Sequence, residues 1–237
     1  MRLWELLFPE KCILCNTVLV KGRRGICSDC RKKLPYITEP RCLHCGKPIS
    51  SAAMEYCFDC SGRTGNLERG ISLWEYNDCM KRVMADFKYG GLESNAAFFA
   101  EELEECYGEK LRDWNIQAIV PVPLYWRKRW FRGYNQAESL SEALGEKLAI
   151  PVFAGLLKRS RNTKPQKGLD SRQRRKNLEN AFSLGKTDGF DVERYSTVLL
   201  VDDIYTTGTT LESCAGVLRG LGIKKVFFAC LCTGGDD

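Results

Sequence analysis

The chain has 237 residues, which is enough for one or two domains. Hydrophobic residues make up 44% of it and charged residues 28%, values that allow a buried core and exclude a largely disordered chain. The net charge of +6 is mild, so the placement of positive charge matters more than its sum. The sequence lacks an apolar stretch of about 18 residues that could span a bilayer, and Glu5 and Pro9 interrupt the short apolar run at its start. We therefore expect a cytoplasmic protein without membrane insertion.

Eight of the thirteen cysteines lie in the first 60 residues as four C-x-x-C pairs, and residues 42–60 repeat the spacing of residues 12–30. In a reducing cytosol, pairs at this spacing are metal ligands more often than disulfides. Each half supplies four thiolates, enough for one tetrahedral Zn²⁺, although spacing alone leaves a cross-braced pairing open. We predict two structural zinc sites with sequential ligands, which are Cys12, Cys15, Cys27 and Cys30 for the first and Cys42, Cys45, Cys57 and Cys60 for the second.

The remaining cysteines are scattered among apolar residues and predict small buried side chains. These are Cys79, Cys106, Cys214, Cys230 and Cys232. His44, the one histidine of the sequence, is expected on the surface of a cysteine knuckle. A turn-rich segment at 61–66 follows the cysteines, and the composition then changes. We predict a double zinc-ribbon domain at 1–64 and a second domain at 65–237.

The second domain alternates strands with helices. Apolar runs predict strands, and apolar residues at helical spacing predict helices that end at glycines. The expected strands are 71–76, 118–122, 198–201 and 226–231, and the expected helices are 78–89, 94–111, 134–148 and 210–221. Such alternation is typical of an α/β fold, a parallel sheet with helices on both faces.

One segment, VLLVDDIYTTGTTL at 198–211, carries a recognisable chemistry. Asp202 and Asp203 follow an apolar strand, at the sheet edge where open α/β folds bind ligands. Gly208 allows the backbone to approach a phosphate, threonine hydroxyls add donors, and a helix start offers free N–H groups. Thr209 and Glu212 fit a capping box. The predicted result is an anion cradle beside two carboxylates.

This segment resembles the 5-phosphoribosyl 1-pyrophosphate (PRPP) motif of type I phosphoribosyltransferases. Preceded by cysteine knuckles, it resembles the ComF family of late-competence proteins, which includes GntX-like proteins. Matching segments extend over almost the whole chain. They include Phe87–Tyr89, Pro121–Leu124, Arg132–Gln136 and the residues Gln166, Arg174, Asn177 and Phe182.

The resemblance implies a phosphoribosyltransferase fold that binds PRPP with Mg²⁺. It assigns the ribose hydroxyls to Asp202 and Asp203, which are also the catalytic candidates. The 5-phosphate would be held by Thr206, Thr207, Gly208, Thr209 and Thr210. Candidates for the pyrophosphate and its flexible loop are Lys88, Arg132, Lys164 and Arg174.

Two clusters of basic residues add a second theme. Residues 158–176 hold nine Lys or Arg against a single acid, Asp170. A smaller cluster at 127–132 is interleaved with aromatic residues, namely Tyr125, Trp126, Trp130 and Phe131. Most of these charges, taken one by one, are expected on a solvated face. The clusters have two further interpretations: closure of a loop over pyrophosphate, or contact with single-stranded DNA, where cations follow phosphates and rings stack on bases.

Three functions therefore stay open at the level of sequence. The chain could transfer phosphoribosyl to an acceptor, or sense PRPP or a nucleotide without turnover. It could also be an adaptor that binds single-stranded DNA and proteins of the competence machinery during DNA uptake for natural transformation. Fold resemblance alone does not separate these functions.

Overall fold

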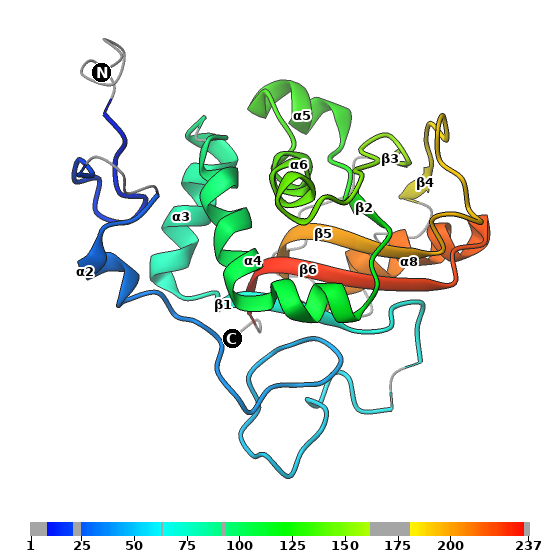
Figure 1. Cartoon of the computed structure of the whole chain (residues 1–237), viewed down its shortest axis with the longest axis horizontal. Coiled ribbons are helices and arrows are strands. Elements are labelled where there is room, and N and C mark those ends of the chain that lie inside the picture. Colours follow the sequence, from blue (N-terminus) through cyan, green and yellow to red (C-terminus); the bar gives the residue numbers. More distant parts are fainter. Residues whose placement is uncertain (1–8, 21–24, 63, 92, 162–180, 235–237) are drawn as a thin grey trace.

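A computed structural model describes residues 9–20, 25–62, 64–91, 93–161 and 181–234. Its centre is a parallel four-stranded sheet in the order β1-β6-β5-β2 (Figure 1). The strands are β1 (Gly70–Glu75), β2 (Ala118–Pro121), β5 (Thr197–Tyr205) and β6 (Lys225–Thr233). A small antiparallel pair, β3 (Leu157–Arg159) and β4 (Phe182–Leu184), stands beside it. The predicted α/β fold with a parallel sheet is therefore confirmed.

Helices cover both faces of the sheet. One face carries α3 (Asp78–Tyr89), α4 (Asn95–Asp113) and α6 (Gln136–Leu148), and the other carries α8 (Thr209–Leu221). These four helices match the predicted ones to within two residues, and Gly222 caps α8 as expected. Two short helices, α2 (Ser28–Arg31) and α5 (Trp126–Arg132), were not predicted. α5 has no buried residue, and therefore lacks the apolar periodicity that reveals a helix.

The strand at 198–201 was predicted too short. β5 runs on to Tyr205 because its pairing with β6 continues to Tyr205 opposite Thr233, whereas β2 ends at Pro121 opposite Val201. Asp202 and Asp203 thus lie inside a strand, just beyond the end of its neighbour β2.

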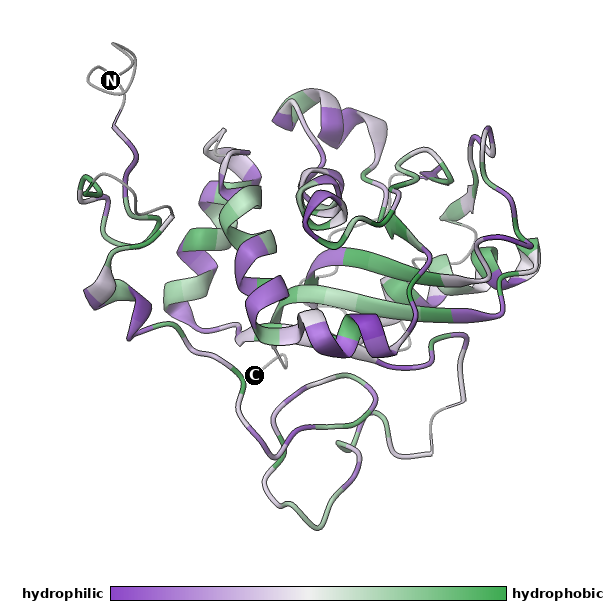
Figure 2. Ribbon diagram, in the orientation of Figure 1, coloured by the Kyte–Doolittle hydropathy of each residue, from purple (hydrophilic) through white to green (hydrophobic). Residues whose placement is uncertain are grey.

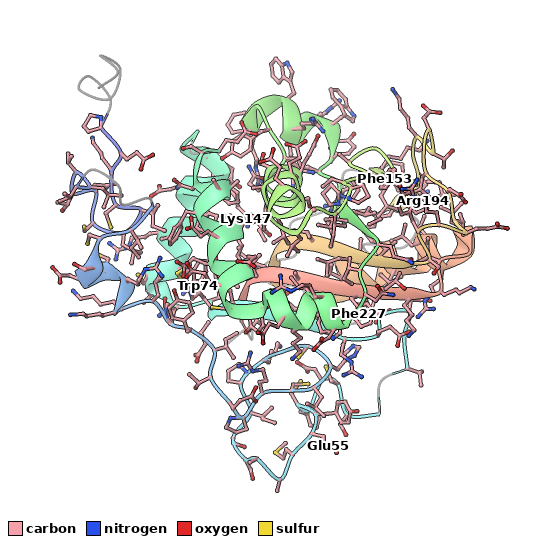
Figure 3. All side chains as sticks on the ribbon, in the orientation of Figure 1. Glu55, Trp74, Lys147, Phe153, Arg194 and Phe227 are labelled. Carbon is pink, nitrogen blue, oxygen red and sulfur yellow. The ribbon has the colours of Figure 1, made fainter. Side chains whose placement is uncertain are left out.

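Alternating residues of β5 and β6 divide the buried apolar side chains into two cores. Leu199, Val201 and Phe227 face α3, α4 and α6, while Val198 and Phe228 face α8. Figure 2 shows the hydrophobic colour along both strands and its alternation with hydrophilic residues along α3 and α4. Trp74 and Phe227 lie at the sheet under α4 (Figure 3), where Phe227 stacks on Trp114 at 4.6 Å.

The two cysteine repeats join opposite cores. Cys12 and Cys30 of the first ribbon (residues 9–20 and 25–34) belong to the core under α3 and α4, which also contains Phe98. Cys42 and Cys45 of the second ribbon (residues 38–62) belong to the core under α8. Glu55 marks the outer end of the second ribbon (Figure 3). The ribbons therefore straddle the sheet at the edge strand β1.

A connector at residues 35–37 runs antiparallel along β1 between the ribbons. Ile37 N–H donates to the Leu73 carbonyl at 3.1 Å, and Glu75 N–H donates to the Pro35 carbonyl at 2.9 Å. This connector pairs the outer edge of β1. The proposed domain boundary near residue 64 thus follows two ribbons whose described residues already pack on the sheet.

The isolated cysteines do not all behave as predicted. Cys214, Cys230 and Cys232 are buried, as expected, but Cys79 is half-buried and Cys106 is exposed. Cys106 lies on α4 between buried positions, so an apolar sequence context did not guarantee burial. No helix among the described residues combines the length and apolarity needed to cross a membrane.

Candidate functional site

The phosphate loop (residues 205–209) joins β5 to α8. Gly208 adopts a φ of 71°, which favours glycine, and it is the N-cap of α8, so the free N–H groups of the first helical turn open beside it. A hollow of about 40 Å³ lies here. Its lining includes Asp202, Ile204, Tyr205, Thr206 and residues 208–211. A small anion fits the dipole and the donors at such a helix start.

Tyr205 forms the floor of the phosphate loop. It is 2% exposed and stacks on Phe228 with ring centroids 5.1 Å apart. A Cβ at Gly208 would lie 2.7 Å from the Tyr205 hydroxyl, so any side chain at this position would collide with the ring. The conformation of the loop therefore depends on the absence of a side chain at Gly208 and on the position of the Tyr205 ring.

The predicted capping box between Thr209 and Glu212 is wrong. The α8 N-cap is Gly208, one residue earlier, and the Thr209 hydroxyl instead hydrogen-bonds the Thr207 hydroxyl at 2.9 Å. The Glu212 carboxylate accepts the backbone N–H of Asn66 at 2.9 Å, and thus binds the segment that leads from the second ribbon into β1. A distant backbone N–H has replaced the local one as the partner of Glu212.

Asp202 and Asp203 stand beside the loop in different electrostatic surroundings. Lys88 at the end of α3 pairs with Asp203, Nζ to Oδ2, at 2.5 Å. Burial opposes ionisation of Asp203, but Lys88 and Arg132 outweigh it and lower the pKa of this carboxyl. Burial and the Asp203 charge raise the pKa of Asp202 to about 8. Asp203 is thus held ionised, whereas Asp202 can gain or lose its proton when a cation or a ribose binds beside it.

Cations that were not predicted also lie near the carboxylates. Arg132 donates to Gln136 at 2.8 Å and to the Tyr89 hydroxyl at 2.9 Å, which orients its guanidinium. Burial and the nearby charges of Arg159, Arg132 and Lys88 lower the pKa of Lys128. Burial also lowers the pKa of Arg159, while Asp202 opposes that shift. Lys88 and Arg132 thus act on Asp203, Arg159 acts on Asp202, and Lys128 lies close to these three cations, an arrangement suited to a polyanion.

Of the four predicted pyrophosphate residues, Lys88 and Arg132 lie at this site. Lys164 and Arg174 lie outside the described residues, as does most of the basic cluster at 158–176. Lys128 and Arg159 were missed as individual candidates, since each was only one charge in a basic run. Their distinguishing signal is spatial: β3 brings Arg159 close to Asp202, and α5 brings Lys128 close to the other cations of the site.

The eight predicted zinc ligands form two compact groups. Within each quartet, 12-15-27-30 and 42-45-57-60, the sulfur atoms all lie within 4.8 Å of one another. Sγ–Sγ distances of 3.8 Å for Cys15–Cys27 and 3.7 Å for Cys45–Cys57 match the tetrahedron edge of about 3.8 Å expected for Zn–S bonds of about 2.3 Å. The sequential pairing is confirmed, and both sites fit Zn²⁺.

A third feature is the aromatic and basic surface of α5. Trp126, Trp130 and Phe131 are 61%, 85% and 76% exposed. The Arg127 guanidinium lies 5.1 Å from the Trp126 ring centroid, so cations and rings alternate on one exposed helix. Through Lys128 and Arg132 this surface is continuous with the site around Asp203.

The sheet order, the phosphate loop and the paired carboxylates define a phosphoribosyltransferase fold. Family models agree, because the double zinc ribbon domain matches residues 3–61 and the phosphoribosyl transferase domain matches residues 132–237. Competence protein F of Haemophilus influenzae is 33% identical over 222 residues, 92% of this chain and 95% of that protein. The chain belongs to the ComF family, whose members carry an N-terminal double zinc ribbon.

Two further relatives match along almost their whole length. Competence protein ComFC of Bacillus subtilis (strain 168) is 30% identical over 232 residues, 89% of each chain. DNA utilization protein YhgH of Escherichia coli (strain K12) is 29% identical over 230 residues, 96% of this chain and 98% of that one. The protein is therefore a phosphoribosyltransferase-like relative of competence and DNA utilization proteins.

Proposed function

We propose that this protein binds PRPP with Mg²⁺ at the phosphate loop and acts in the cytosol during DNA uptake for natural transformation. One observation carries the first part: an anion cradle at the start of α8 adjoins two carboxylates, with the cations Lys88, Arg132 and Arg159 close to them. PRPP has the complementary layout, with a 5-phosphate, ribose hydroxyls and a pyrophosphate. The names of the relatives support the second part.

Each group of the ligand has a matching set of side chains. The N–H groups and hydroxyls at 206–210 would hold the 5-phosphate, and Asp202 and Asp203 would hold the ribose hydroxyls. Carboxylate and phosphate oxygens are the hard donors that Mg²⁺ prefers, and the bound ion would neutralise part of the pyrophosphate charge. Lys88, Lys128 and Arg159 would supply further positive charge. Pyrophosphate departure needs such positioning and electrostatics rather than a covalent nucleophile.

The test is titration of PRPP and Mg²⁺ into the protein by calorimetry. Asp202→Asn combined with Asp203→Asn should abolish measurable PRPP binding while the circular dichroism spectrum stays unchanged. Burial already disfavours the charge of Asp202, whereas Asp203→Asn removes the ion pair with Lys88, so the spectrum also tests whether the variant folds. Asp188→Asn, on an exposed turn between β4 and β5, is the matched control and should bind PRPP normally. Wild-type affinity in the double variant would refute the site.

Turnover separates an enzyme from a sensor. Release of pyrophosphate from PRPP in the presence of candidate bases would support phosphoribosyl transfer to an acceptor. Saturable binding of PRPP without release would support a non-catalytic sensor of PRPP or a nucleotide. The assay uses the same protein and the same Asp202 and Asp203 variant as its background measurement.

A second candidate function, binding of single-stranded DNA, is favoured by the α5 surface. Exposed rings can stack on bases while the interleaved cations neutralise phosphates. Trp130→Ala should weaken binding of a labelled oligonucleotide about fivefold or more, and affinity should fall steeply with salt. Phe58→Ala is the control, because Phe58 is 93% exposed but lies on the second ribbon. Equal losses in both variants would contradict the assignment to α5.

A further inference from the structure

We propose that the second ribbon positions the phosphate loop, so that Zn²⁺ at residues 42-45-57-60 supports binding of a phosphoribosyl ligand. The positioning residue is Lys47, which follows the predicted zinc ligand Cys45 by two residues. This inference rests on the proposed function, because the loop it concerns is the one assigned to the 5-phosphate. Two independent sets of contacts carry it.

The first set runs through Lys47. Its side chain is only 13% exposed, although it carries a charge, and its Nζ pairs with Asp59 Oδ2 at 3.1 Å. The same Nζ lies 5.7 Å from the ring centroid of Tyr205, the floor of the phosphate loop. A buried ammonium is attracted to the face of an aromatic ring, so Lys47 helps to hold the Tyr205 ring in position. Since Tyr205 in turn touches Gly208, a shift of Lys47 reaches the N-cap of α8 in two steps.

The knuckle itself keeps Lys47 in place. The Cys42 N–H donates to the Lys47 carbonyl at 2.8 Å, and the Gly46 N–H donates to the Cys42 carbonyl at 2.9 Å. Both hydrogen bonds belong to the turn that brings Cys42 and Cys45 onto one metal. Folding of such a turn depends on the metal, because the bonds to Zn²⁺ hold its cysteines in one place. Loss of Zn²⁺ therefore releases Lys47.

The second set runs through the segment between the second ribbon and β1. Asn66 N–H donates to the Glu212 carboxylate at 2.9 Å in the first turns of α8, and the Asn66 carbonyl accepts from Arg219 Nε at 3.0 Å near its end. His44 anchors the segment to the ribbon, because its carbonyl accepts the Gly70 N–H at 2.7 Å. Its ring Nδ1 also lies 3.0 Å from the Glu68 carbonyl. The helix that begins at the phosphate loop is thus held along its length.

The first ribbon provides a built-in control. Thr17 occupies the position equivalent to Lys47, thirty residues earlier in the repeat, and its hydroxyl lies 3.2 Å from Cys15 Sγ. The contacts of this ribbon are made to α4 on the opposite face of the sheet, through Arg31 and Glu102. A change at Thr17 therefore alters the equivalent knuckle of the first ribbon, which packs on the α4 side and away from the phosphate loop.

The experiment combines calorimetry with PRPP and Mg²⁺, zinc analysis and hydrogen exchange of the peptide that covers residues 205–212. Lys47→Met keeps the length of the side chain and removes its charge. We expect two zinc ions per chain, faster exchange at 205–212 and about tenfold weaker PRPP binding. Cys57→Ser should lose one zinc ion, and its exchange at 205–212 should be faster and its PRPP binding weaker than in Lys47→Met. Thr17→Met should leave exchange at 205–212 and PRPP affinity unchanged.

Two results would overturn the inference. One is wild-type exchange at 205–212 in both Lys47→Met and Cys57→Ser, whatever the ligand binding. The other is wild-type PRPP affinity in Lys47→Met while the Asp202 and Asp203 variant no longer binds. If the wild-type protein binds no PRPP, the proposed function fails, but the exchange measurement still decides whether the second ribbon holds the loop.

Discussion

The two zinc ribbons have the same cysteine spacing and opposite surroundings. The first packs on the face of the sheet that carries α3, α4 and α6, where Arg31 pairs with Glu102 of α4 at 2.5 Å. The second packs against β1 and the face of α8, where Lys47 lies against Tyr205. Ligand spacing therefore determines how a ribbon folds around its metal. The residues between the ligands determine which part of the protein it contacts.

The pair Asn16-Thr17 and its counterpart Gly46-Lys47 illustrate this difference. Asn16 and Gly46 both adopt a positive φ, of 58° and 73°, as the knuckle requires. A Cβ at Gly46 would lie 3.2 Å from the backbone nitrogen of Ser72, so only the second knuckle approaches β1 closely. The two copies thus differ at the positions where the second knuckle approaches β1 and Tyr205.

The largest effect should come from removing one metal. Cys27→Ser and Cys57→Ser are equivalent changes at equally half-buried ligands, and each should reduce the zinc content from two to one. Exchange should rise in α4 for the first variant and in residues 205–212 for the second, because the ribbons hold different elements. Mass spectrometry of exchanged peptides measures both. Identical exchange patterns would break the comparison.

A smaller effect is expected where the first ribbon contacts α4. Glu102 is 1% exposed and holds both Arg31 and the Tyr36 hydroxyl. Glu102→Ala leaves these donors without their partner and should lower the free energy of unfolding by about 2 kcal/mol. PRPP affinity should not change. Denaturant unfolding with parallel calorimetry checks this, and a loss of PRPP binding would show that both ribbons act on the site.

The segment after the second ribbon should contribute less. Arg219 donates to the Asn66 carbonyl and pairs with Glu68 at 2.7 Å, and its side chain is 30% exposed. Arg219→Ala should therefore cost about 1 kcal/mol of stability. Lys224→Ala is a control on the exposed turn that follows α8. A cost equal to that of the control would mean that Arg219 adds nothing to the attachment.

The smallest effects should come from exchanging the knuckle residues. Asn16→Gly keeps a positive φ accessible and should change stability by less than about 0.5 kcal/mol. Gly46→Asn places a side chain against the β1 backbone and should cost about 1 kcal/mol or more. Thermal unfolding of the two variants compares them directly. Equal effects would indicate that β1 yields to the second knuckle.

Much of this architecture could be predicted from local patterns. Helix α3 was placed correctly because Met80, Val83 and Phe87 repeat at helical spacing, and the zinc ligands were found because their spacing is diagnostic. β5 was predicted too short because two aspartates look like the end of a strand. Its actual end depends on pairing with β6, which no local pattern records.

The parts that escaped prediction depend on distant contacts. Glu212 had a plausible local partner in a capping box, but Asn66, 146 residues earlier in the chain, binds it instead. Arg159 stands out from other basic residues only because the fold brings it to Asp202, and Lys128 only because it lies beside Arg159, Arg132 and Lys88. The site therefore combines a recognisable loop with cations whose role is visible only in three dimensions.

The connector at residues 35–37 has a practical consequence. It pairs the outer edge of β1 through the bonds of Ile37 and Glu75, and thereby closes one side of the sheet. A shortened chain that began after the cysteines would carry the phosphate loop but expose this edge as a template for pairing with other chains. Such a fragment should self-associate, which makes the full-length chain the suitable material for solution work.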